Sequence, residues 1–220
     1  MMPKVLVTAF DAFGGEPVNP AARAVVGLAG LAARRREGCG TDAGDCRTVE
    51  LITAEIPTVF GESAARVQRL IDEQAPDVLI CVGQAGGAHG IRVERVALNI
   101  DSARIADNAG NRPSERPIAG DGPVAYWATI PTCEIVDALK AQGIPAFLSY
   151  TAGTFVCNHV FYSACHYAAT HGLPTKVGFI HVPYLPEQAA GKDATPSMSE
   201  ECIRRALDVA IAVAVGKEPN

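Results

Sequence analysis

The sequence predicts an α/β protein in which a parallel or mixed sheet is covered by helices on both faces. Strand-like and helix-like patterns alternate from one end of the chain to the other, which is typical of this class. The run at 78–82 is continuously apolar, as expected of a strand buried on both faces. A length of 220 residues with 48% hydrophobic content fits one sizeable globular domain, so residues 1–220 are expected to form a single unit.

Six strands are predicted from apolar or alternating runs, at 4–9, 48–56, 78–82, 91–100, 146–150 and 176–182. The run at 78–82 is expected to lie at the centre of the sheet. In the segment 91–100 the alternation changes phase between Val93 and Val96, which predicts a bulge or bend at Glu94 and Arg95. The run at 146–150 predicts a short buried strand.

Five helices are predicted, at 19–36, 61–73, 130–141, 158–170 and 199–215. The first begins well because Asn19 is a good N-cap and Pro20 suits the first helical position. Gly143 ends the third helix, and Ser199 followed by two glutamates opens the last. The turn-rich run 37–45 predicts a surface loop, and 108–122 predicts a long polar loop.

Composition excludes several classes of partner and compartment. The formal net charge of −5 disfavours nucleic acid and anionic membrane surfaces, which call for clustered basic residues. No signal peptide is recognised, and no run approaches the roughly 18 apolar residues of a membrane span. The seven cysteines are odd in number and form no Cys-x-x-Cys pair, which favours reduced thiols in the cytoplasm and no zinc-ribbon site.

Cys157 is the candidate nucleophile. It follows a strand and a small-residue turn at 151–154 and stands where the helix 158–170 begins. The free amides and positive dipole end of a helix N-terminus favour the reactive thiolate. The alternative is a buried structural cysteine, which is the more common role of a free cysteine.

A nucleophilic cysteine needs a base, and geometry reduces the five histidines to two. Helical spacing directs His159 and His166 away from Cys157, and His171 is too far along the same helix. His181 ends a strand, where catalytic groups gather in open α/β sheets, and is favoured over His89 in its glycine-flanked loop. A purely structural strand-end histidine would have the same sequence pattern.

A carboxylate is expected to orient the imidazole, and Glu94 at the phase change is the natural choice. The alternative is a surface ion pair between Glu94 and the neighbouring Arg92 or Arg95. Asp101 and Asp107 are possible substitutes for Glu94.

Two loops at strand ends predict a substrate site. The loop 83–87 lacks the spacing of a phosphate-binding motif, but Gln84 and its backbone amides can donate hydrogen bonds to an oxyanion. Phe10 and Phe13 flank a second glycine-containing loop and, with Phe155, predict an uncharged aromatic slot for a flat, neutral group.

These segments together closely resemble the pyroglutamyl peptidase I family, the cysteine peptidases that remove an N-terminal 5-oxoproline. The match runs nearly from end to end and is most specific around the cysteine and histidine. The matching segments lie at 5–20, 55–60, 76–100, 103–108, 149–159 and 178–188.

The resemblance implies a single three-layer α/β/α sandwich with a twisted, mostly parallel sheet, commonly a homotetramer, without metal or cofactor. It implies Cys157 as nucleophile, His181 as base and Glu94 as carboxylate. It also implies a lactam site formed by Phe10, Phe13 and Phe155, with Gln84 and Arg104 nearby. Peptides with an N-terminal pyroglutamate are the expected substrates; a phosphorylase-like enzyme and a non-catalytic 5-oxoproline-binding protein are the alternatives.

The chain departs from the family pattern in a few loop positions. Ala9, Ala12 and Ala106 stand where the family usually has Gly, Pro and Pro, and the Gly-rich run at 39–45 is extended. These differences affect the expected shape and rigidity of loops and leave Cys157 and His181 in place.

Overall fold

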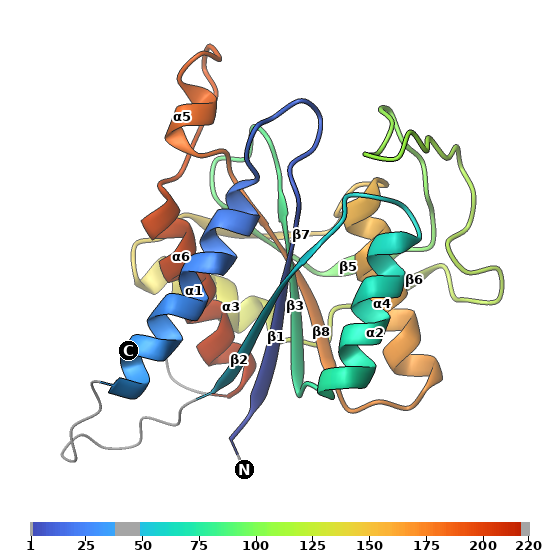
Figure 1. Cartoon of the computed structure of the whole chain (residues 1–220), viewed down its shortest axis with the longest axis horizontal. Coiled ribbons are helices and arrows are strands. Elements are labelled where there is room, and N and C mark those ends of the chain that lie inside the picture. Colours follow the sequence, from blue (N-terminus) through green and yellow to red (C-terminus); the bar gives the residue numbers. More distant parts are fainter. Residues whose placement is uncertain (1, 38–48, 217–220) are drawn as a thin grey trace.

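A computed structural model describes residues 2–37 and 49–216 of the chain, and it has one main sheet between two layers of helices (Figure 1). The sheet has six strands in the order β2-β1-β3-β8-β4-β7. Their bounds are β1 (Lys4–Phe10), β2 (Glu50–Ile56), β3 (Val78–Gln84), β4 (Ile91–Glu94), β7 (Ala146–Ser149) and β8 (Lys176–Val182). β4 pairs antiparallel with β8, and the other pairs are parallel, so the predicted mixed α/β sheet is confirmed.

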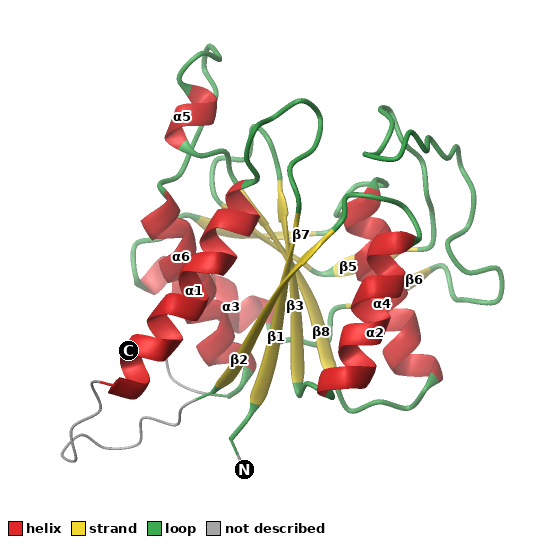
Figure 2. Cartoon of the chain, viewed as in Figure 1, coloured by secondary structure: helices red, strands yellow, loops and turns green. Residues whose placement is uncertain are grey.

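The helices divide between the two faces of the sheet (Figure 2). One face carries α1 (Pro20–Glu37), α3 (Thr132–Ala141) and α6 (Glu200–Ala214), and the other carries α2 (Glu62–Gln74) and α4 (Val156–Thr170). The predicted central position of β3 is confirmed, because it lies between β1 and β8 and is buried along its apolar run. In the described residues no helix is long and apolar enough to cross a bilayer.

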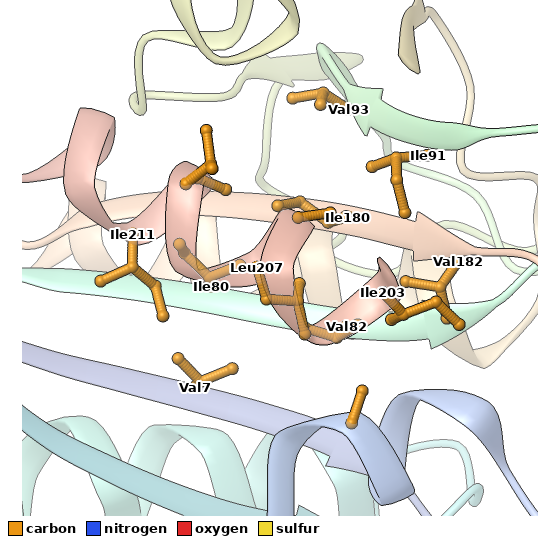
Figure 3. Packing of buried hydrophobic residues seen from close by; sticks show 14 of the residues in the cluster. Val7, Ile80, Val82, Ile91, Val93, Ile180, Val182, Ile203, Leu207 and Ile211 are labelled. Atoms are coloured by element: carbon orange, nitrogen blue, oxygen red, sulfur yellow. The ribbon is translucent and has the colours of Figure 1, made fainter. Parts of the chain in front are cut away.

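Alternating side chains of the central strands supply both apolar layers. Figure 3 shows Ile80 and Val82 of β3 beside Ile180 and Val182 of β8, facing Leu207 and its neighbours on α6. The intervening positions of the same strands face α2 and α4. Because successive side chains of a strand point to opposite faces, this division also decides which strand residues can reach Cys157 on α4.

The phase change predicted a bulge or bend at Glu94 and Arg95, and the structure has a bend there rather than a bulge within one strand. β4 ends at Glu94, and the chain leaves the main sheet to form β5 (Val96–Leu98), which pairs with β6 (Ala125–Trp127) in a separate two-stranded sheet. The Arg95 N–H still donates to the carbonyl of Ser149 beside the main sheet, whereas the Arg95 carbonyl accepts from Ala128. The change of phase therefore marks a transfer between two sheets.

Other boundaries differ by smaller amounts. The helix predicted to begin at 158 begins at Val156, and β7 is only partly buried because it forms the edge of the sheet. The short helix α5 (Pro186–Ala189) was not predicted. The loop predicted at 37–45 lies outside the described residues except for Glu37, which ends α1.

Asn158 connects α4 to the segment that leaves the main sheet. Its fully buried side chain accepts a hydrogen bond from the Leu98 N–H at 2.9 Å and donates to the Leu98 carbonyl at 2.9 Å and the Ile100 carbonyl at 3.0 Å. The amide thus satisfies three backbone groups and fixes the helix that carries Cys157.

We expect Asn158→Leu to lower the free energy of unfolding by about 2–4 kcal/mol, because it leaves these backbone groups without their partner. Urea unfolding followed by circular dichroism measures the change. Thr170→Ala, at the exposed end of the same helix, should change stability by no more than about 0.5 kcal/mol. Equal unfolding midpoints for the two variants would contradict the role of Asn158.

Candidate active site

Cys157 is the second residue of α4, in the first turn of the helix. The turn before it depends on Gly153, whose φ of 81° favours glycine and whose N–H donates to the Thr151 hydroxyl. Thr154 and Ser102 exchange two hydrogen bonds that attach this turn to the neighbouring segment. Phe155, the N-cap, provides no side-chain hydrogen bond, so amides of the first turn are available to a substrate oxygen.

The thiol lies beside His181, directly over a glycine of β3. A β-carbon added at Gly83 would lie 3.1 Å from Cys157 Sγ, 3.2 Å from His181 Cδ2 and 3.0 Å from Phe179 Cζ. Register explains this convergence, because Gly83 of β3 is paired with His181 of β8 on the face covered by α4. The candidate nucleophile and base therefore lie next to each other.

Glu94 holds the other side of the imidazole. The Nδ1 of His181 lies 2.8 Å from Glu94 Oε1, and both side chains are buried. Since Nδ1–H donates to the carboxylate, Nε2 is the nitrogen that remains for the thiol of Cys157. Glu94 Oε2 has no hydrogen-bond partner in the described chain, so the charge of this carboxylate is stabilised mainly through His181.

The electrostatic balance favours a protonated imidazole. Burial opposes a charge on His181, but interaction with the Cys157 thiolate and the Glu94 carboxylate outweighs burial and raises the pKa of His181 to about 9. Such a ring can hold a proton at neutral pH beside the sulfur of Cys157. This arrangement is suited to nucleophilic attack followed by proton donation to a leaving group.

The alternative carboxylates have other partners. Asp101 accepts from His159 Nδ1 at 3.0 Å, and Asp107 accepts from the Phe60 N–H at 2.9 Å. The alternative ion pairs of Glu94 with Arg92 and Arg95 are absent from the described chain. These two arginines lie instead over the aromatic rings of Phe147, Trp127 and Tyr150.

In the described residues the remaining histidines have partners other than the thiol of Cys157. His159 donates to Asp101 through Nδ1 and accepts the Gly61 N–H at Nε2, 3.1 Å away. His89 stacks on Phe147, with ring centroids 4.8 Å apart. His166 contacts the Tyr126 hydroxyl, and His171 lies at the opposite end of α4 from Cys157.

The predicted aromatic residues separate into two groups. Phe13 and Phe155 lie together, with ring centroids 6.1 Å apart, and Phe60 packs edge-on against Phe155 at 5.4 Å. Phe10 is buried in the core against Phe179. Asp11 fixes the loops of this cluster, because its carboxylate accepts the Thr58 N–H at 2.7 Å.

The structure does not place the side chains of Gln84 and Arg104 against the thiol of Cys157. Gln84 follows Gly83, so its side chain leaves the opposite face of β3, where its Oε1 accepts from Gln188 Nε2 at 3.2 Å. Arg104 is exposed, two residues after the Ser102 backbone that binds Thr154. The structure thus brings together Cys157, His181 and Glu94, and separately Phe13 and Phe155.

Sequence reasoning missed Phe60 and the function of Gly83. Phe60 lies in a loop that contacts Phe155 only in the folded chain, so its aromatic type was the sole available signal. Gly83 belonged to a recognised glycine loop, but its specific contact with the thiol depends on strand register. In the described residues no group of three or more His, Cys, Asp or Glu side chains is arranged to hold a metal ion.

Comparison with known proteins gives one consistent family. Residues 3–217 match the family model described as pyroglutamyl peptidase. Pyrrolidone-carboxylate peptidase 1 of Ralstonia nicotianae is 48% identical over 219 residues, covering 100% of this chain and 96% of the relative. Pyrrolidone-carboxylate peptidase of Alkaliphilus oremlandii is 49% identical over 212 residues, covering 96% of this chain and 93% of the relative.

Solved structures agree with the sequence comparison. The crystal structure of pyroglutamyl peptidase I from Bacillus amyloliquefaciens superposes with a TM-score of 0.88 at 44% identity, covering 99% of this chain and 97% of that one. A mutant pyrrolidone carboxyl peptidase of Pyrococcus furiosus has a TM-score of 0.85 at 39% identity, covering 96% and 98% of the two chains. The likeness therefore extends over the whole fold.

The raised pKa of His181 predicts a titration that depends on its neighbour. In the wild-type protein the ring should stay protonated through neutral pH and lose its proton near pH 9. Cys157→Ala removes the stabilising thiolate, so the pKa of His181 should fall, and ring ¹⁵N chemical shifts measure it. Cys133→Ala, at an exposed cysteine of α3, serves as the control. Identical His181 titrations in all three proteins would contradict the interaction.

Proposed function

Because the chain belongs to the pyroglutamyl peptidase family, we propose that it hydrolyses the amide bond after an N-terminal pyroglutamyl (5-oxoproline) residue of peptides. Cys157 is the proposed nucleophile, His181 the acid and base, and Glu94 the group that orients the imidazole. The observation that carries this assignment is the contact of thiol and imidazole over Gly83, with the carboxylate bound to the far ring nitrogen.

The proposed reaction has two halves. His181 accepts the proton of Cys157, and the sulfur attacks the carbonyl carbon between pyroglutamate and the next residue. The carbon–nitrogen bond breaks as His181 gives its proton to the leaving amine, which leaves a thioester on Cys157. Water then attacks the thioester with His181 as base, releasing 5-oxoproline and restoring the thiol.

The surroundings of the thiol support each charge that develops. Glu94 keeps the Nδ1 proton in place and stabilises the imidazolium, which is the function of the carboxylate in related triads. The carbonyl oxygen becomes negative during attack, and amides in the first turn of α4 can donate to it. Gln84 and Arg104 are proposed to contact the polar groups of the substrate main chain, and backbone amides of the loop 83–87 are proposed as further donors to the oxyanion.

The aromatic cluster formed by Phe13, Phe60 and Phe155 explains selectivity for a lactam in this proposal. Phe13 and Phe155 offer apolar surface to a flat, uncharged ring, and Phe60 supports Phe155 from the side. Phe10 contributes through the core, next to Phe179. An ordinary N-terminus would bring an ammonium group that must lose hydration against these rings.

Other properties of the family are proposed for this chain on the same grounds. The substrates are peptides with an N-terminal pyroglutamate, and the enzyme is proposed to act without a metal or cofactor as a homotetramer in the cytoplasm. Sedimentation equilibrium gives the number of subunits.

The test of the proposed function is release of 5-oxoproline from a chromogenic pyroglutamyl amide. Cys157→Ala and His181→Ala should each lower kcat by roughly a thousandfold or more, as expected for groups that take part in bond making. Cys133→Ala should leave the rate unchanged, because this exposed cysteine lies on α3. Full activity of Cys157→Ala would overturn the assignment.

The same assay separates the two rival functions. Turnover that requires phosphate and survives thiol alkylation would identify a phosphorylase-like enzyme. Binding of 5-oxoproline without hydrolysis by the wild-type protein would identify a binding protein. The proposed peptidase requires neither phosphate nor a second protein.

Gly83→Ala should lower kcat roughly 10- to 100-fold, because the added methyl group displaces the thiol and the imidazole from each other. KM should change less, since the aromatic cluster lies on other segments. Gly120→Ala is the matched control, because a β-carbon there meets no atom within 4 Å. Wild-type kcat in Gly83→Ala would show that the close contact over β3 is unimportant for catalysis.

A further inference from the structure

Arg92 lies on the same face of the sheet as His181, and its cation has no anionic partner among residues 2–37 and 49–216. The two residues are direct partners in the antiparallel pairing of β4 with β8. Ile91 and Val93 pack into the apolar layer on the opposite face, so Arg92 and Glu94 share the face of the imidazole. Cross-strand partners on one face have neighbouring side chains.

The guanidinium of Arg92 has aromatic support and no anion. It lies over the ring of Phe147 at 5.7 Å, and His89 stacks on the same ring. In the described part of the chain Arg92 makes no ion pair, and its buried Nε has no hydrogen-bond partner. The nearby carboxylate of Glu94 is already bound to His181.

In the proposed mode of substrate binding, Arg92 lies on the side of the scissile bond that carries the leaving amine. Phe13 follows β1 and Phe60 follows β2, the thiol lies over β3, and the imidazole is on β8. Arg92 is on β4, the next strand in the order β2-β1-β3-β8-β4-β7. A substrate with its lactam at the aromatic cluster and its carbonyl at the thiol therefore directs the leaving amine toward β8 and the following residue toward β4. Neighbouring strands are about 4.8 Å apart, which is within the reach of one amino-acid residue.

We infer that Arg92, supported by Phe147, binds a carboxylate carried by the residue that follows pyroglutamate. This inference rests on the proposed function and adds a substrate class to it. The carboxylate is either an acidic side chain or the free C-terminus of a pyroglutamyl dipeptide, because a guanidinium binds both in the same two-pronged geometry. A carboxylate on the substrate would give the guanidinium of Arg92 an anionic partner.

The experiment compares kcat/KM within two pairs of substrates. Pyroglutamyl-glutamate amide against pyroglutamyl-glutamine amide tests the side chain, and pyroglutamyl-alanine against its amide tests the C-terminus. The wild-type enzyme should prefer the carboxylate member of at least one pair roughly 3- to 10-fold, the range expected of a partly exposed charge pair. Arg92→Gln should reduce that ratio to about 1, and Arg92→Lys should keep part of it.

Arg95→Gln is the matched control. It removes the same charge and also breaks contacts between a guanidinium and aromatic rings, here Trp127 and Tyr150, but Arg95 lies outside the main sheet. Its substrate ratios should equal those of the wild type. Comparing ratios at one pH cancels any change in the basicity of His181.

Failure of the inference differs from failure of the proposed function. If the neutral peptides are cleaved but the ratios are the same in wild type and Arg92→Gln, the carboxylate site is overturned and the peptidase stands. Identical ratios for Arg92→Lys and Arg92→Gln would overturn recognition by charge. If none of the four substrates is cleaved, the proposed function itself is overturned.

Discussion

The geometry of the site depends on the missing side chain at Gly83. The first turn of α4 brings a sulfur and β8 brings an imidazole to the same place over β3, where an added β-carbon would meet both within 3.2 Å. Burial at this position opposes the imidazolium, so its charge is maintained by Cys157 and Glu94 on either side. The contact between the Cys157 sulfur and the His181 imidazole over Gly83 therefore accounts both for the close packing and for the raised pKa of His181.

The order of strands in the main sheet places aromatic, acid–base and cationic side chains one after another across the site. Phe13 and Phe60 follow the strands on one side of the thiol, the imidazole of His181 lies on β8, and Arg92, which has no anionic partner in the described chain, lies on β4 beyond it. Register and alternation make this possible, because Arg92 pairs with His181 and Glu94, two residues later, lies on the same face. The pairing of β4 with β8 thus brings both the carboxylate of Glu94 and the guanidinium of Arg92 to the face of His181.

Local sequence signals predicted the main sheet and selected Cys157, His181 and Glu94 as candidate site residues. They could do so because helix starts, strand ends and apolar runs are short-range features. Local patterns carry less information where partners distant in sequence decide the outcome. β5 and β6 have three residues each, too few to show alternation, and exist because they pair with each other. Phe10 was expected to wall a slot, but strand β1 extends far enough to bury its ring against Phe179. The contacts of Gly83 and Arg92 follow from register, which no local pattern encodes.

The most direct test of the central claim is to look for the covalent intermediate. The enzyme is mixed with a pyroglutamyl amide, quenched in acid during turnover, digested at low pH and mapped by mass spectrometry. Our account predicts a pyroglutamyl group attached as a thioester to Cys157 and to none of the other six of the seven cysteines. Attachment to a different residue, or product release with no acylated peptide under conditions that preserve thioesters, would contradict it.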